Sequence, residues 1–129
     1  MIALAAALSI VLPHGWHVTT APQMAVTDPV QRFALYSGAR LPATGSPRQT
    51  QVVAVLMEQE PAAQSGFPTR PRLFHLPRCG TMESLTGDRW GEIVFRDHGR
   101  SFYFFVWVGR SATAQIPMLL TALDSLRVS

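Results

Sequence analysis

The chain has 129 residues, of which 47% are hydrophobic and 15% charged, and its net charge is +3. This composition excludes an intrinsically disordered chain, and the length suits one domain, 1–129, that can bury its own core. A single cysteine, Cys79, excludes an intramolecular disulfide, and the modest charge does not indicate a nucleic-acid partner.

Residues 1–12 are apolar except for Ser9. The side chains from Leu8 to Leu12 follow a period of two around Ser9, which predicts a first strand that ends at Pro13. The same segment resembles the apolar part of a signal peptide, although no basic residue precedes it.

A helix of this length would span only about 18 Å, well short of the roughly 30 Å hydrocarbon core of a membrane. We therefore expect a first strand at 1–12, with a residual signal-like segment or a truncated anchor as the alternative. Membrane association would be possible only through this N-terminal segment, and the compartment stays open between the bacterial cytoplasm and export.

Two strands are predicted before the middle of the chain, after a turn at His14–His17 and a loop at Thr19–Pro29. Arg32–Ser37 alternates between apolar and wetter positions, which is typical of a strand with one buried face. Gln51–Gln59 is rich in β-branched residues and predicts a second, fully buried strand.

Proline dominates the next segment, Pro61–Pro77, which contains four prolines and cannot form a regular helix. At most, Leu73–Leu76 forms a short edge strand there. Cys79–Gly91 is a polar connection with Trp90 near its end.

The last third of the chain carries the strongest pattern. Glu92–Arg96, Asp97–Arg100 and Phe102–Val108 read as a strand, a tight turn and a strand. The second strand is apolar on both faces, which is typical of a strand in the middle of a sheet that is covered on both sides.

A helix follows, because apolar residues recur at helical spacing on one stripe. The stripe comprises Ile116, Leu119, Leu120, Leu123 and Leu126. Ser111 or Thr113 is expected to cap its start, and Pro117 is tolerable only in its first turn. Together these elements predict an α+β fold, an antiparallel sheet with the C-terminal helix packed on one face and other segments partly covering the second.

The order of these pieces resembles the PsbP/Mog1-like family of small α/β/α sandwiches. The matching parts are an apolar strand leading into Pro13-His-Gly-Trp16, an aromatic hairpin, and a helix closing on Asp124-Ser-Leu-Arg127. Phe67-Pro-Thr-Arg-Pro-Arg72 and Ile93–Arg100 also look like uncharacterised domains of high-GC bacteria. The resemblance implies an accessory or binding role and supplies no catalytic residues.

Two groups of residues are candidates for ligand or partner binding. Arg70, Arg72 and Arg78 form a local cationic cluster, and guanidinium groups bind carboxylate or phosphate in bidentate fashion. The favoured alternative for this cluster is a solvated loop that its prolines stiffen. Trp16 and Trp90 flank loops and could line a pocket or a partner surface, but core packing is the favoured role for both.

We expect no metal site, no cofactor and no catalytic set. His14 and His17 are three apart and could form a zinc site together with His75 or Cys79, but such a site needs three or four converging ligands, and only two are close in sequence. Cys79, His75 and Asp88 lack any nucleophile-elbow pattern.

The sequence therefore favours a non-catalytic accessory or protein-interaction domain with an unidentified protein partner. The alternative is a carrier of a small-molecule or anionic ligand, with a pocket near the Pro/Arg-rich 61–78 segment. A small hydrolase is a third reading. A deep apolar pocket would favour the carrier, and an exposed apolar patch would favour the partner-binding domain.

Overall fold

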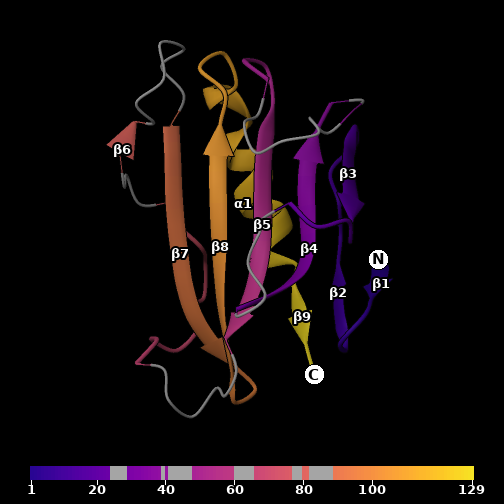
Figure 1. Cartoon of the computed structure of the whole chain (residues 1–129), viewed down its shortest axis with the longest axis vertical. Helices are drawn as coiled ribbons and strands as arrows, with labels where there is room; N and C mark the ends of the chain where they lie inside the picture. Colours follow the sequence, from indigo (N-terminus) through magenta and orange to yellow (C-terminus); the bar gives the residue numbers. More distant parts are fainter. Residues whose placement is uncertain (24–28, 39, 41–47, 60–65, 77–79, 82–88) are drawn as a thin grey trace.

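A six-stranded antiparallel sheet forms the larger layer of the molecule (Figure 1). The computed structural model describes residues 1–23, 29–38, 40, 48–59, 66–76, 80–81 and 89–129. In spatial order the strands are β3 (Trp16–Thr19), β4 (Val30–Ser37), β5 (Val52–Gln59), β8 (Arg100–Val108), β7 (Arg89–Asp97) and β6 (Gly80–Thr81).

The second layer lies against one face of this sheet. It contains helix α1 (Ile116–Asp124), which a short 3-10 helix at Thr113–Gln115 precedes. It also contains a small antiparallel sheet in the order β1 (Ile2–Leu4), β2 (Leu8–Ile10) and β9 (Arg127–Val128). Figure 1 shows α1 behind the large sheet, so the near face in that view is the one opposite the helix. The predicted α+β class, with a C-terminal helix on one face of an antiparallel sheet, is confirmed.

The two strands that are apolar on both faces lie in the middle of the sheet, as the sequence predicts. β5 is buried from Val52 to Glu58, and the whole of β5 pairs with β8, from Val52 opposite Val108 to Gln59 opposite Ser101. β8 has a strand on each side, and its side chains alternate in burial. Phe102, Phe104, Val106 and Val108 are buried on the helix side, whereas Tyr103, Phe105 and Trp107 on the opposite face are half-buried, so only the helix side is covered as fully as the sequence predicts. The hairpin of β7 and β8 is also confirmed, with Asp97 opposite Arg100 at its tip.

The main core lies between the large sheet and the helix layer. Four phenylalanines, Phe33, Phe95, Phe102 and Phe104, are fully buried in it. In the predicted helical stripe, Leu119, Leu123 and Leu126 are buried, and Ile116 and Leu120 are partly buried at the margin of the core. The apolar stripe therefore holds α1 on the sheet as expected.

The first twelve residues form a hairpin and not one strand. β1 and β2 pair through Leu4 and Leu8, and the connection places Ala6 and Ala7 at φ 60° and 56°. Alanine rarely adopts this left-handed conformation, so a run of alanines gives no signal for a turn. Ala6 and Ala7 are tied to the rest of the chain, since their carbonyl oxygens accept hydrogen bonds from Arg100 Nη1 and from the Ser129 amide.

Three smaller expectations are wrong. The N-cap of α1 is Gln115, without a side-chain capping bond, so neither Ser111 nor Thr113 has that role. Leu73–Leu76 forms no strand, and the nearby Thr69 instead makes a bridge to Arg96 at the end of β7. Trp90 lies within a strand because β7 begins one residue earlier, at Arg89.

Candidate functional site

The tip of the β7–β8 hairpin is a two-residue turn formed by His98 and Gly99. Their φ angles are +52° and +71°, as in the type I′ turns that suit the twist of a two-stranded ribbon. Gly99 adopts this conformation without cost because it has no Cβ, whereas His98 is a non-glycine residue held in the left-handed region. The turn places Asp97 and His98 side by side at the end of the sheet.

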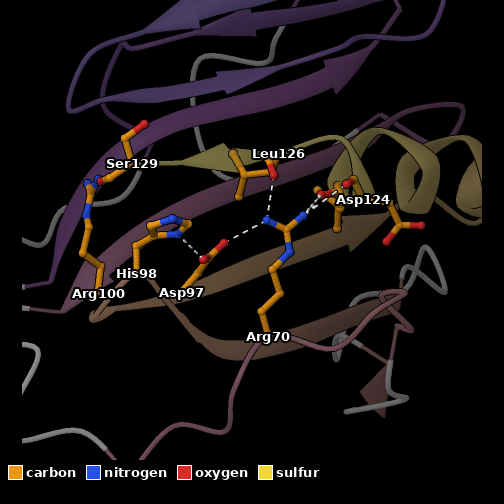
Figure 2. A network of polar contacts seen from close by, with 8 residues as sticks. Arg70, Asp97, His98, Arg100, Asp124, Leu126 and Ser129 are labelled. Atoms are coloured by element: carbon orange, nitrogen blue, oxygen red, sulfur yellow. Dashed lines mark hydrogen bonds and ion pairs between the residues drawn. The ribbon is translucent and has the colours of Figure 1, made fainter.

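Arg70 connects this turn to the C-terminal end of α1 (Figure 2). Its Nη1 donates to the Leu126 carbonyl oxygen at 2.6 Å and to Asp97 Oδ2 at 2.9 Å. Its Nη2 donates to the Asp124 carbonyl oxygen at 3.1 Å. The last carbonyl groups of a helix lack intrahelical partners and carry partial negative charge, so a guanidinium here acts as a C-terminal cap.

Asp97 is shared between Arg70 and His98. While Oδ2 accepts from Arg70, Oδ1 lies 2.6 Å from His98 Nδ1. Burial raises the pKa of Asp97, but the hydrogen bonds and positive charges of Arg70 and His98 outweigh burial and hold this pKa below its ordinary value. The carboxylate therefore stays ionised and fixes the ring orientation of His98.

An open pocket lies beside this turn. Its volume is about 510 Å³, and it is lined by Thr69, Arg70, Arg96, Asp97, His98 and Gly99. Its far wall is held in place by backbone bonds, because the Arg70 amide donates to the Arg96 oxygen and the Arg96 amide donates to the Pro68 oxygen. Arg96, Thr69 and His98 are all exposed, so polar groups are available to a bound molecule.

A second ionic cluster closes the same end of the main core. Glu58 is 4% exposed and accepts hydrogen bonds from Arg32 at 2.8 Å and from both Nε and Nη2 of Arg100. Burial raises the pKa of Glu58, but the two guanidinium groups lower it more, and the net pKa is below its ordinary value. Arg100 also donates to the backbone oxygens of Ala6 and Ser129, so this cluster joins both layers.

The face of the large sheet opposite α1 carries a second apolar group of residues, which we call the aromatic face. Ala34, Val53, Val55 and Met57 are buried at its centre, and Tyr36, Tyr103, Phe105 and Trp107 are half-buried around them. Phe67 packs against Tyr103, with ring centroids 5.2 Å apart. The aromatic side chains of this face thus keep part of their surface in water, unlike the buried phenylalanines of the other face.

The structure does not gather the five predicted binding residues at one place. Trp16 is 6% exposed and packs in the main core, whereas Trp90 lies opposite Trp107 on the aromatic face and is half-buried. The guanidinium of Arg70 caps the C-terminal end of α1, and Arg72 is exposed in the following segment. Arg78 lies outside the described residues.

Sequence reasoning missed the partners of Arg70. Asp97 and His98 were recognised as turn residues, but the contacts that join them to Arg70 link segments far apart in the chain. Within the described part of the chain, no three His, Cys, Asp or Glu side chains gather as a metal-binding group. The same residues contain no helix long and apolar enough to cross a membrane.

Comparisons with protein-family models, with curated proteins and with solved structures find no match for this chain. The resemblance to PsbP/Mog1-like domains therefore remains a proposal.

Proposed function

We propose that this chain is a non-catalytic accessory domain that binds a protein partner through its aromatic face. The observation that carries the proposal is the contrast between the two faces of the large sheet. On the helix side Phe33, Phe102 and Phe104 are fully buried, whereas Tyr36 and Trp107 on the opposite face are only half-buried. Tyrosine and tryptophan are the side chains that most often dominate binding energy at protein interfaces.

The chemistry of this face favours a partner with a largely apolar surface. Register places Tyr36, Val53, Trp107 and Trp90 in one row across four strands. Register also places two charged residues of β7 on this side of the sheet, Glu92 opposite Phe105 and Arg96 opposite Ser101. Apolar surface of this kind gains free energy when a partner covers it and water leaves, at roughly 25 cal/mol for each Å² that is buried. The accessory roles implied by the PsbP/Mog1-like resemblance agree with this proposal.

Site-specific photo-crosslinking in cells tests the proposal. A photoreactive phenylalanine analogue at Trp107 is expected to give one discrete adduct, and a second change in the same face, Tyr36→Thr, is expected to reduce its yield. Leu73 is 58% exposed and lies outside the aromatic face, so the same probe at Leu73 is the matched control. Equal adducts at Trp107 and Leu73, or none at Trp107, would refute the proposal. An adduct of twice the chain's mass would identify a second copy as the occupant.

A second candidate function, a carrier of an anionic ligand, is favoured by the position of the polar pocket. This pocket is bounded by Thr69 and Arg70, in the Pro/Arg-rich segment that suggested a ligand site from sequence. Native mass spectrometry of the chain purified from its own cells tests this function, because a resident ligand adds its mass to the protein. A bare chain that also gains no mass in added phosphate would count against a carrier.

A further inference from the structure

His98 combines two properties that rarely occur together, because its imidazole is exposed and yet fixed in orientation. Its side chain is 62% exposed, and its Nδ1 lies 2.6 Å from Asp97 Oδ1. An exposed histidine usually samples several rotamers, whereas an imidazole bonded to a carboxylate has one preferred ring orientation and one preferred tautomer.

The carboxylate that orients His98 is itself held from behind. Asp97 has only 15% of its side chain exposed, and its second oxygen accepts from Arg70, which the carbonyl oxygens of Asp124 and Leu126 hold in turn (Figure 2). A continuous series of bonds thus runs from the end of α1 through Arg70 and Asp97 to the imidazole. Fixing a group through supporting contacts of this kind is typical of binding sites.

The turn itself does not require histidine. A two-residue type I′ turn favours asparagine before glycine, since asparagine adopts the left-handed conformation more readily. His98 at φ +52° is therefore a less favourable choice for the backbone than Asn. The imidazole at this position calls for an explanation other than turn formation.

The polar groups around the pocket favour a negatively charged ligand. Both oxygens of Asp97 are engaged by positive or polar partners, which reduces the negative charge that Asp97 presents. Arg96 and Thr69 line the same pocket and are exposed, so both add polar groups to those of His98. Donors of these types form charge-assisted hydrogen bonds to phosphate and carboxylate oxygens.

We propose that the pocket at the tip of the β7–β8 hairpin binds a small oxyanion of the phosphate, sulfate or carboxylate class, and that His98 is protonated in the bound state. This inference rests on the second candidate function and is independent of partner binding at the aromatic face.

Proton uptake follows from the geometry. When Nδ1 donates its hydrogen to Asp97, Nε2 of the neutral ring carries a lone pair and cannot donate to an oxyanion. Protonation turns Nε2 into a donor and adds a positive charge next to the pocket. The other charged groups around His98 are Arg96, Asp97 and Arg100 of the hairpin, with Arg70 and Asp124 behind them. Where the free ring is neutral, anion binding should therefore be coupled to proton uptake, and it should strengthen as the pH falls.

The test is a titration of the full chain with sodium sulfate, because sulfate keeps its charge between pH 8 and pH 5.5. Imidazole NMR resonances report the ligation of each histidine, and calorimetry in two buffers of different ionisation enthalpy counts protons. We expect affinity about tenfold higher at pH 5.5 than at pH 8, in line with a hydrogen bond to a charged group. Titrations with inorganic phosphate and with acetate then establish which oxyanion class is preferred.

Three variants separate the site from general surface charge. His98→Asn suits the turn and should abolish the pH dependence together with the proton uptake. Arg96→Gln should lower affinity severalfold. His14→Asn replaces another exposed histidine in a turn and should leave binding unchanged.

The outcomes distinguish this inference from the function on which it rests. Sulfate binding with the same pH dependence in His98→Asn as in the unaltered chain would leave an anion carrier but overturn the role of His98. An absence of binding at both pH values, for sulfate and phosphate alike, would overturn both. Equal losses in His98→Asn and His14→Asn would reduce the effect to surface charge and would also overturn the site.

Discussion

Replacing Arg70 with methionine removes the group that caps α1, and the structure gives the expected size of the loss. Methionine keeps an apolar stem near the Phe74 ring, over which the guanidinium now lies at 5.1 Å, but it offers no donor. Four hydrogen bonds disappear. Three of them, to Leu126, Asp97 and Asp124, are no longer than 3.1 Å, and the fourth, to the Leu123 carbonyl oxygen, is long at 3.4 Å. At about 1 kcal/mol for each of the three short bonds in a partly buried site, the free energy of unfolding should fall by about 3 kcal/mol.

Urea unfolding at pH 7, followed by tryptophan fluorescence, measures this loss directly. Arg72→Met is the matched control, because Arg72 is exposed two residues further on, and its effect should stay within about 0.5 kcal/mol. Arg70→Lys should lie between the two, since a single ammonium cannot replace a planar fork of donors. A loss below about 1 kcal/mol for Arg70→Met would refute the capping role, because three formed bonds of this kind sum to more.

Three further perturbations have defined outcomes. The pKa of Glu58 is lowered in the folded state, so its stabilising contribution is present above its unfolded pKa and is lost as the pH falls through the folded value. Thermal unfolding between pH 6 and pH 3 should show this loss. Glu58→Gln should make the unfolding temperature depend less steeply on pH. Gly109→Ala should destabilise by at least about 2 kcal/mol in urea unfolding, because the new methyl group would overlap the Arg48 backbone oxygen, while Gly66→Ala meets no atom within 4 Å and should be neutral. Ala7→Gly should stabilise by about 0.5–1 kcal/mol in calorimetry because it relieves a left-handed alanine, and destabilisation would contradict the observed backbone.

The parts of the fold that sequence predicts are those with a local and repeated signal. Phe102–Val108 and Val52–Gln59 carry long apolar runs that predict their place in the middle of the sheet, although the predicted cover is complete on the helix side and only partial over Tyr103, Phe105 and Trp107. The stripe through Leu119 and Leu123 likewise fixes the packed side of α1. By contrast, the hairpin at Ala6 depends on bonds from the distant Arg100, which no local pattern encodes.

The candidate site was predictable only in its components. Arg70 was recognised as part of a cationic cluster, and Asp97 and His98 as turn residues, but each pattern is short and has a common structural explanation. Their joint arrangement depends on the path of residues 66–70 along the end of β7 and on the position of α1. These are tertiary contacts between distant segments, so composition and spacing could not reveal them.

The pairing of β2 with β9 bears on the order in which the molecule folds. Leu8 lies opposite Val128, so this contact joins residues near the two ends of the sequence, whereas the β7–β8 hairpin closes over two residues. Closing a long loop costs more conformational entropy than closing a tight turn, and we expect the aromatic hairpin to form early and the small sheet late. Substitutions at Leu8 or Val128 should then speed unfolding and leave the refolding rate nearly unchanged, while substitutions at Phe102 should slow refolding.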